Sequence, residues 1–381
     1  MGERVAVVGA GPVGLFAGLL LARAGADVVV LERRERRSGH SRAIGIHPPA
    51  LAALESAGVA SDLLAAGVRI PGGEARCGGR RLAELSFATV PGPYPFVLSV
   101  PQAETERILE RHLERAGADL RRGVEVMGLR QNAAGAVLRT SRGEITAGFV
   151  VGADGARSAV RDAAGIAAPV RTYPDAYVMG DFGEHDDGGA PDARAVLYLE
   201  AEGVVESFPL PGGTRRWVVR TGRRVTEPDA GSLVAAVRRR TGVVLDPASN
   251  SMLSAFGVRR RIAERFVAGP VALVGDAAHE ISPIGGQGMN LGWLDVAMLV
   301  PRVVEQMGGH DAGRGLAVYS AARRRAAQVA ARQAHLNMAL GRSVPGPLLP
   351  ARNRLLSAVA TLPSVHDAVA RTFTMSPRRS R

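Results

Sequence analysis

The sequence contains no lysine, so every one of its 48 residues in the Lys and Arg class is an arginine. It also has a single cysteine, Cys77, which excludes an intrachain disulfide and a thiolate-based metal site. The spacing of the other residues suggests no metal site either. Because one unpaired cysteine is typical of a reducing compartment, we expect the protein in the cytoplasm.

Aromatic residues are scarce, at 4% of the chain, and long apolar runs are missing. The apolar stretch at residues 13–22 is far shorter than the ~18 residues that a membrane span needs. The N-terminal residues also lack the basic, apolar and small-residue order of a signal peptide. We therefore expect no transmembrane segment.

The formal net charge is +12, which by itself would fit a nucleic-acid partner. The arginines, however, stand in short clusters at residues 33–37, 238–240, 259–261 and 323–325 rather than in one tract. Few aromatic side chains are present on which bases would stack. We expect no nucleic-acid partner and interpret the surplus of arginine as a solvated surface.

A chain of 381 residues predicts two or three domains. An apolar run at residues 5–8, a glycine-rich turn, an apolar helical stretch and a second apolar run from residue 28 predict a β-α-β unit. Between about residues 173 and 266, short β-rich runs alternate with Pro and Gly turns, which predicts an inserted antiparallel sheet. We expect an α/β domain in residues 1–75, 100–172 and 268–340, a β-sheet domain in residues 76–99 and 173–267, and a C-terminal helical segment with a basic tail in residues 341–381. Helical periodicity is found at residues 51–64, 104–116, 292–306 and 314–340.

The first glycine motif consists of Gly9, Gly11 and Gly14, between a predicted strand and a predicted helix. The first glycine permits a tight turn, the second lets the backbone approach a pyrophosphate, and the third lets the helix pack on the strand. Glu32 ends the second strand, where a carboxylate can accept both hydroxyls of an adenosine ribose. Strand, helix and acid together indicate dinucleotide binding, with a purely structural turn as the alternative.

Two further motifs follow short apolar runs. One is Gly152-Ala153-Asp154-Gly155, and the other begins at Gly275-Asp276 and continues through Pro283 to Gly286-Gln287-Gly288-Met289-Asn290. Taken singly, each motif could also be a capped helix start, with Asp154 or Asp276 as the N-cap.

The order and spacing of the three motifs resemble the flavoprotein aromatic hydroxylases, which share the fold of p-hydroxybenzoate hydroxylase. The resemblance covers about residues 4–340. It implies a GR2-type, Rossmann-like FAD-binding domain with an inserted antiparallel β-sheet substrate domain and C-terminal helices. It also implies that the following residues contact FAD: Gly9, Gly11, Pro12, Val13, Gly14, Glu32, Arg33, Arg42, Gln102, Arg107, Val126, Asp154, Gly155, Asp276, Pro283, Gly286, Gly288, Met289 and Asn290.

The resemblance also implies a reaction. NADPH or NADH reduces FAD, O2 forms a flavin C4a-hydroperoxide, and one oxygen atom passes to an aromatic or polycyclic natural-product intermediate. No second GxGxxG occurs, so we expect the nicotinamide cofactor to visit the flavin transiently. Phe208, Trp217 and Arg220 are candidates for the substrate pocket, and for each a core or surface position is an equal alternative. His47 and His279 are candidates for proton transfer, although a capping or buried structural histidine is the more frequent case, and no catalytic residue is assigned.

Several alternatives remain open within this fold. A flavin halogenase is excluded, because that branch relays hypohalous acid through a lysine. An epoxidase, a Baeyer–Villiger-type oxygenase and an FAD-dependent prenyl reductase remain possible, as does a non-enzymatic binding protein that uses its arginine surface. We expect a monomer or a homodimer.

Overall fold

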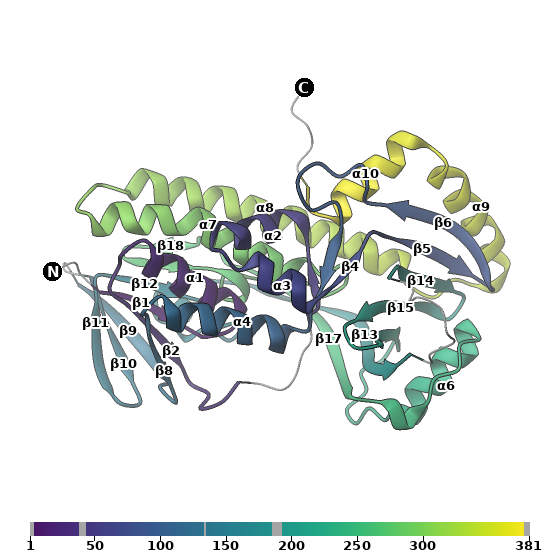
Figure 1. Cartoon of the computed structure of the whole chain (residues 1–381), viewed down its shortest axis with the longest axis horizontal. Coiled ribbons are helices and arrows are strands. Elements are labelled where there is room, and N and C mark those ends of the chain that lie inside the picture. Colours follow the sequence, from purple (N-terminus) through teal and green to yellow (C-terminus); the bar gives the residue numbers. More distant parts are fainter. Residues whose placement is uncertain (1–3, 38–42, 133–134, 185–192, 377–381) are drawn as a thin grey trace.

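The structure is a computed structural model that describes residues 4–37, 43–132, 135–184 and 193–376. It has two main parts, each built on one large sheet (Figure 1). Arg42, an expected flavin contact, lies outside the described residues, as does the end of the basic tail.

The first part contains a six-stranded sheet in the order β18-β19-β12-β1-β2-β8. Its central strands are runs of branched apolar residues that are buried on both faces, as expected for parallel strands between helical layers. The strands are β1 (Val5–Val8), β2 (Val28–Glu32), β8 (Asp119–Arg122), β12 (Phe149–Gly152), β18 (Val267–Ala268) and β19 (Val271–Leu273). All pairings are parallel except that of β18 with β19.

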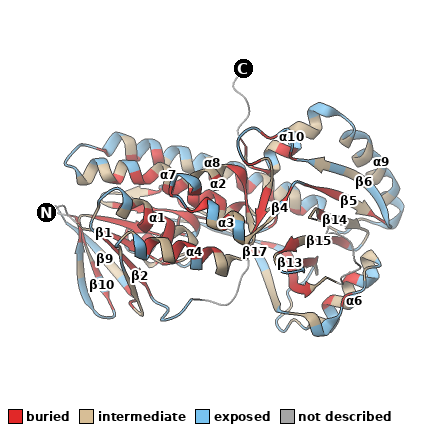
Figure 2. Ribbon diagram, viewed as in Figure 1, coloured by how far each residue is buried: buried red, intermediate tan, exposed pale blue. Residues whose placement is uncertain are grey.

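Helices cover this sheet and bury its apolar face, and Figure 2 shows the buried residues concentrated on the strands and the inner helix faces. The helices of this part are α1 (Pro12–Arg23), α2 (Pro48–Ser56), α3 (Ala60–Ala66), α4 (Gln102–Arg115), α5 (Ala159–Ala163), α7 (Gln287–Met307) and α8 (Gly313–Leu340). Residues 51–64 were expected to form one helix, but the chain breaks it into α2 and α3 at Gly58. That glycine has φ +63°, a left-handed conformation that ends a helix.

The second part is an eight-stranded sheet in the order β20-β17-β13-β16-β15-β14-β5-β6. Its strands are β5 (Gly72–Cys77), β6 (Arg80–Ser86), β13 (Val170–Gly183), β14 (Ala195–Glu200), β15 (Gly203–Leu210), β16 (Thr214–Arg220), β17 (Met252–Ile262) and β20 (His279–Glu280). The pairings are antiparallel, as expected, except that β14 and β5 run parallel. Helix α6 (Ala230–Thr241) packs against one face of this sheet.

The remaining elements flank these parts. Two three-stranded sheets combine β3 (Gly45–Ile46), β7 (Val97–Ser99) and β4 (Val68–Ile70), and β9 (Val126–Asn132), β10 (Gly135–Thr140) and β11 (Gly143–Ala147). The C-terminal helices α9 (Leu349–Ala360) and α10 (Pro363–Phe373) lie against β6. Among the described residues, no helix has the length and apolar character to cross a membrane.

Helix α8 and strand β17 connect the two parts (Figure 1). The first half of α8 places Tyr319 in the core of the α/β part, whereas Met338 near its end belongs to a core cluster of the eight-stranded sheet. At the end of β17, Ile262 pairs with His279 of β20, directly after the turn that follows β19. The second sheet is therefore fixed to the strand end of the first.

A buried ion cluster fixes that turn. Asp295 of α7 accepts hydrogen bonds from the backbone N–H of Gly275 at 3.0 Å and from Arg323 Nε at 2.6 Å, and its Oδ2 lies 2.6 Å from His279 Nε2. Asp295 and His279 are fully buried. The neighbouring positive groups hold the pKa of Asp295 below its usual range despite its burial, and the pKa of His279 is raised by Asp295.

We predict that Asp295→Ala lowers the free energy of unfolding by about 3–5 kcal/mol, because it leaves buried Arg323 and His279 without a counter-charge. Chemical denaturation followed by circular dichroism measures this change. The control is Asp27→Ala, which removes the solvent-exposed ion pair with Arg4 and should cost less than ~1 kcal/mol. Equal effects of the two substitutions would contradict the structural role of Asp295.

Candidate active site

A cavity of about 960 Å³ lies between the glycine motifs of the α/β part and one face of the eight-stranded sheet. Parallel strands β1 and β12 end at this cavity, so the turns that follow them meet there. The C-terminal helix α10 closes one side, where Phe373 stacks on Phe87 and lies beside His47.

The first motif forms a close turn. A Cβ atom on Gly14 would lie 1.9 Å from the carbonyl oxygen of Gly9, and Gly9 itself has φ +103° with the Ala153 backbone directly beside it. At Gly11, by contrast, no atom lies within 4 Å of a Cβ position, and this residue lines the cavity. Gly9 and Gly14 are therefore required by packing, whereas Gly11 leaves space for something other than protein.

Two properties make this turn suited to an anion and a ribose. Helix α1 begins at Pro12, and no acidic residue in its first turn offsets the positive end of the helix dipole. Val13 also lines the cavity. The carboxylate of Glu32 accepts hydrogen bonds from the backbone N–H of Ala10 at 2.8 Å and of Arg34 at 3.0 Å, which fixes it beside the turn.

The second motif follows β12 and lies directly beside the first motif, where Ala153 contacts the turn at Gly9. Asp154 Oδ2 accepts a hydrogen bond from the Val160 N–H at 3.1 Å, so the carboxylate caps the start of α5. Its Oδ1 is buried with no partner among the described residues, and burial raises the pKa of this carboxyl. Gly155 lines the cavity. Asp154 thus keeps one acceptor atom beyond its capping role.

The third motif provides a second helix N-terminus. Helix α7 begins after Gly286, which has φ +66°, and its first turn contains no acidic residue. Pro283, Gly286, Gly288 and Met289 line the cavity. The motif's Asn290 is fully buried, accepts a hydrogen bond from the His47 N–H at 2.8 Å and donates to Gly45 O and Gly286 O. Asn290 therefore ties the loop at residues 45–47 to the start of α7.

Asp276 presents its carboxylate to the cavity. Although the side chain is open to the cavity, the surrounding protein desolvates the carboxylate and raises its pKa to about 6, and the charge of His279 opposes this shift. No side chain bonds to it among the described residues. Asp276 is available to accept a hydrogen bond from a bound molecule.

On α4, Gln102 and Glu106 face the cavity together. Gln102 Nε2 donates to Glu106 Oε1 at 2.8 Å, and burial raises the pKa of Glu106. Arg107, expected to contact flavin, instead points to solvent and pairs with Glu104. The i,i+4 spacing of Gln102 and Glu106 puts them on one helix face, which Arg107 does not share. That spacing could have identified Glu106, which the sequence reasoning missed.

Two other residues that were expected to contact FAD, Arg33 and Val126, are not among the described residues that line the cavity. Arg33 is exposed after β2, and Val126 is buried in the core of the α/β part. His279 belongs to the Asp295 cluster. His47 does line the cavity, and its burial lowers its pKa to about 4, so the ring is neutral at physiological pH.

The three substrate-pocket candidates on the sheet do not all face the cavity. Phe208 lines the cavity. Trp217 points to the opposite face, where it packs with Leu233 of α6, because neighbouring residues of a strand face opposite sides. Arg220 donates from Nε to Asp175 Oδ1 at 3.1 Å, and it is not among the described cavity-lining residues.

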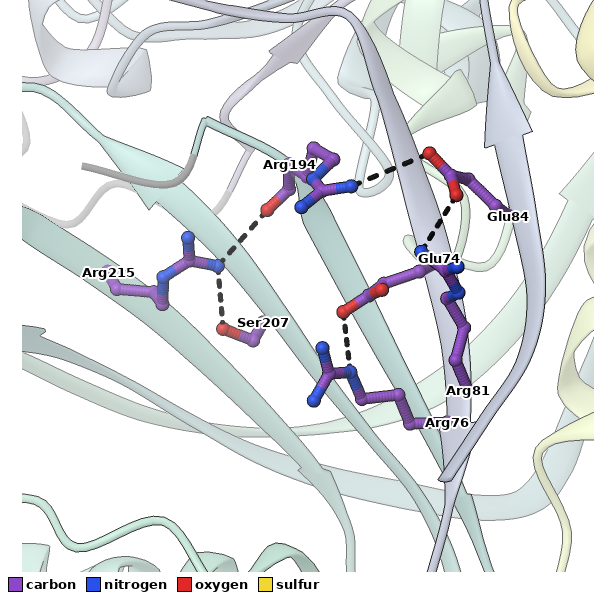
Figure 3. Close-up of polar contacts among 7 residues, drawn as sticks. All are labelled: Glu74, Arg76, Arg81, Glu84, Arg194, Ser207 and Arg215. Atoms are coloured by element: carbon purple, nitrogen blue, oxygen red, sulfur yellow. Dashed lines mark hydrogen bonds and ion pairs between the residues drawn. The ribbon is translucent and has the colours of Figure 1, made fainter. Parts of the chain in front are cut away.

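The sheet face also carries charged residues that the sequence reasoning missed. Arg216 pairs with Asp181 at 2.6 Å and lines the cavity. Figure 3 shows two further cavity-lining acids with their partners: Glu74 bonds to Arg76, and Glu84 bonds to Arg194. These ions are paired within the protein.

Comparison with known proteins agrees with this arrangement. The family described as FAD binding domain matches residues 3–334. The uncharacterized aromatic compound monooxygenase YhjG of Bacillus subtilis strain 168 is 34% identical over 303 residues, which are 77% of this chain and 60% of that protein. The chain thus spans about three fifths of the length of that relative.

Two solved structures are similar over nearly the whole chain. The p-nitrophenol 4-monooxygenase PnpA of Pseudomonas putida DLL-E4 has a TM-score of 0.88 at 26% identity, covering 99% of this chain and 100% of PnpA. The Diels-Alderase PyrE3 of pyrroindomycin biosynthesis has a TM-score of 0.84 at 28% identity, covering 100% of this chain and 81% of PyrE3. By its sequence motifs, its fold and its match over most of its length, this chain belongs to the FAD binding domain family of flavoprotein monooxygenases and hydroxylases.

Proposed function

We propose that the protein is a single-component, FAD-dependent monooxygenase that uses NADPH or NADH and O2 to hydroxylate an aromatic or polycyclic small molecule. The observation that supports this most is the single cavity that joins the glycine motifs to an apolar sheet face. The cavity has room for a dinucleotide at the glycine motifs and for an organic ring beside it at the sheet face. We place the reaction in the cytoplasm, where nicotinamide cofactors are available.

In this proposal the chain's own residues hold FAD by known types of contact. The N-terminus of α1 and the open space at Gly11 receive the pyrophosphate, and Glu32 accepts the adenosine ribose hydroxyls. Asp276 accepts a ribityl hydroxyl. The N-terminus of α7 at Gly288 directs partial positive charge toward the ring system. FAD bound there would supply the electron transfer and oxygen activation that amino acids do not.

The other residues orient the substrate and exclude water. Phe208, Val218 and Met179 give the sheet side of the cavity an apolar surface on which a ring can pack. Phe373 of α10 and neutral His47 close the cavity near the start of α7. Such enclosure limits the access of water to the reacting groups.

A second candidate function is a ring-closing reaction without net oxidation, because PyrE3, which has the same fold, is a Diels-Alderase. An enzyme of that kind would use the cavity to hold one folded substrate and would need no NAD(P)H. The two candidates therefore differ in whether reductant and O2 are consumed.

We predict that the purified protein binds FAD and that phenolic substrates accelerate its oxidation of NADPH or NADH. Stopped-flow reduction of bound FAD without oxygen, with and without phenols and polycyclic quinols, measures the acceleration. Turnover under ¹⁸O2 should place one labelled oxygen atom in the product. A product without label, formed without NAD(P)H consumption, would support the ring-closing candidate instead. Labelled products from isolated olefins alone would indicate an epoxidase.

We predict opposite outcomes for two neighbouring glycines. Gly11→Ala should leave the stability of FAD-free protein unchanged but weaken FAD binding at least about tenfold, because the new methyl group takes the space of the pyrophosphate. Gly14→Ala should prevent folding, because its Cβ meets the Gly9 carbonyl oxygen. Thermal unfolding and FAD titration distinguish the two effects. Unchanged FAD affinity in Gly11→Ala would place the pyrophosphate elsewhere.

We predict that Asp276→Ala loses a hydrogen bond to a charged acceptor, a contact of about 1.5–3 kcal/mol. FAD affinity should then fall roughly 10- to 150-fold. Because the pKa of Asp276 is about 6, the affinity of the unsubstituted protein should also fall as pH drops through 6, where the carboxylate becomes protonated. Asp276→Asn should weaken this pH dependence. If Asp276→Ala bound FAD with full affinity and kept the same pH profile, Asp276 would have only a structural role.

A further inference from the structure

Glu206 stands in the middle of the sheet face that lines the cavity. On β15 it pairs with Leu197 of β14 on one side and with Val218 of β16 on the other, and Val218 pairs in turn with Met179 of β13. All four residues line the cavity. One carboxylate therefore interrupts a row of apolar side chains that crosses the sheet.

This carboxylate differs from Glu74 and Glu84, the acids that β5 and β6 contribute to the same wall of the cavity. Its side chain is buried, with 7% relative exposure, and has no hydrogen-bond or ion-pair partner among the described residues. Glu74 and Glu84, by comparison, are bonded to arginines (Figure 3). Burying a carboxyl group without a hydrogen-bond partner is unfavourable in free energy. A ligand that donates a hydrogen bond to Glu206 would reduce this cost.

The nearby arginines are already bonded to acids of the protein. Arg216 is bonded twice to Asp181, and Arg220 is bonded to Asp175, which also accepts from Arg342. Desolvation alone raises the pKa of Glu206 to about 7. The group therefore exchanges a proton near neutral pH, and no fixed protein partner holds it in one state.

We propose that Glu206 binds the hydroxyl group of a phenolic substrate and accepts its proton. In this step the phenol O–H bond breaks, the proton joins a carboxylate oxygen of Glu206, and the electron pair stays on the phenol oxygen. The ring becomes more electron-rich, which favours attack on an electrophilic oxygen donor. This assignment rests on the proposed function, because it names the substrate class for the same cavity.

The surroundings favour a neutral phenol over charged ligands. A substrate carboxylate would be repelled by Glu206, and an ammonium group would lose its hydration among apolar side chains such as Phe208 and Phe256. A phenol enters uncharged, packs its ring on these side chains and needs one polar partner. Glu206 provides that partner.

The test compares phenols with their methyl ethers, which have the same ring but no proton to give. Isothermal titration calorimetry of the FAD-loaded protein measures the binding of 1-naphthol against 1-methoxynaphthalene and of 4-ethylphenol against 4-ethylanisole. Both phenols stay uncharged near neutral pH. We expect each phenol to bind roughly 10- to 150-fold more tightly than its ether, the range of a hydrogen bond to a charged group. Equal binding of phenol and ether in both pairs would overturn the proposal, as would tighter binding of 1-naphthylmethylamine than of either phenol.

Variants assign this preference to one residue. In Glu206→Gln we expect the preference for phenol to fall to within a few-fold of unity, whereas Glu206→Asp, which retains a carboxylate, should recover part of it. The control is Glu84→Gln. Glu84 also lines the cavity but is paired with arginines, so the preference for phenol should be unchanged in this variant. An undiminished preference in Glu206→Gln would assign the hydroxyl to another group.

The preference should also depend on pH. Because Glu206 is a carboxylate only above its pKa of about 7, the preference for phenol should increase as pH rises through 7 and be absent from the profile of Glu206→Gln. The charged or titratable groups that share its face on the neighbouring strands or line the facing cavity walls are Asp175, Tyr177, Asp181, Arg216, Arg220, Arg259, Glu280, Glu74, Glu84, His366, Arg34, His47, Glu106 and Asp276. The pKa of Tyr177 lies far above this range. A flat profile in the unsubstituted protein would contradict the assignment.

Failure of this proposal is distinguishable from failure of the proposed function. A protein that binds no FAD, or that oxidises no NAD(P)H with any phenol, would refute the monooxygenase. An active enzyme that treats phenols and ethers alike, or that is unaffected by Glu206→Gln, would refute only the role of Glu206.

Discussion

The negative charge of Asp295 is the constraint on which the geometry of the cavity depends. It bonds simultaneously to the turn after β19, to His279 of β20 and to Arg323 of α8, so it fixes these three elements to α7. A carboxylate with no water around it needs all of these partners to offset its desolvation. Because Asp276 lies in the same turn and β20 follows directly, the cluster sets the position of a cavity wall and of the second sheet together.

In the eight-stranded sheet, neighbouring residues of each strand point to opposite faces. Trp217 and Val205 belong to the core beneath α6, whereas Val218 and Glu206, their neighbours in the chain, line the cavity. A shift of a single position would bury the cavity side chains under α6 and expose the core. The antiparallel pairing of β15 with β16 and β13 therefore determines the chemistry of the cavity as much as the identity of the residues does.

The parts of the site that could be predicted from the sequence are those made by short segments of chain. Gly9, Gly11 and Gly14 lie within one turn, so their spacing alone specifies the backbone geometry. For Trp217 the sequence left a pocket and a core position open, because a tryptophan among β-rich residues does not reveal which face it occupies. That face depends on pairing with a strand some forty residues away in the chain. Arg107 was misplaced because a family motif gives a position on a helix but not which face of α4 is turned to the cavity. Glu206 was missed because its burial and lack of partners arise only when the sheet assembles.

The fold itself leaves the reaction open, since a p-nitrophenol monooxygenase and a Diels-Alderase share it at similar TM-scores. What separates such proteins must lie in the wall opposite the glycine motifs, because the motifs specify a dinucleotide and nothing about the substrate.

In this chain the two sides of the cavity differ in charge. Two helix N-termini without acidic residues point in from the α/β part, and on the sheet the carboxylate of Glu206 has no partner among the described residues. A molecule that bridges the two sides is oriented with its hydrogen-bond acceptors toward the helices and its hydrogen-bond donors toward the sheet. That polarity suits a phenolic ring held over an anionic cofactor better than it suits a hydrocarbon with no donor.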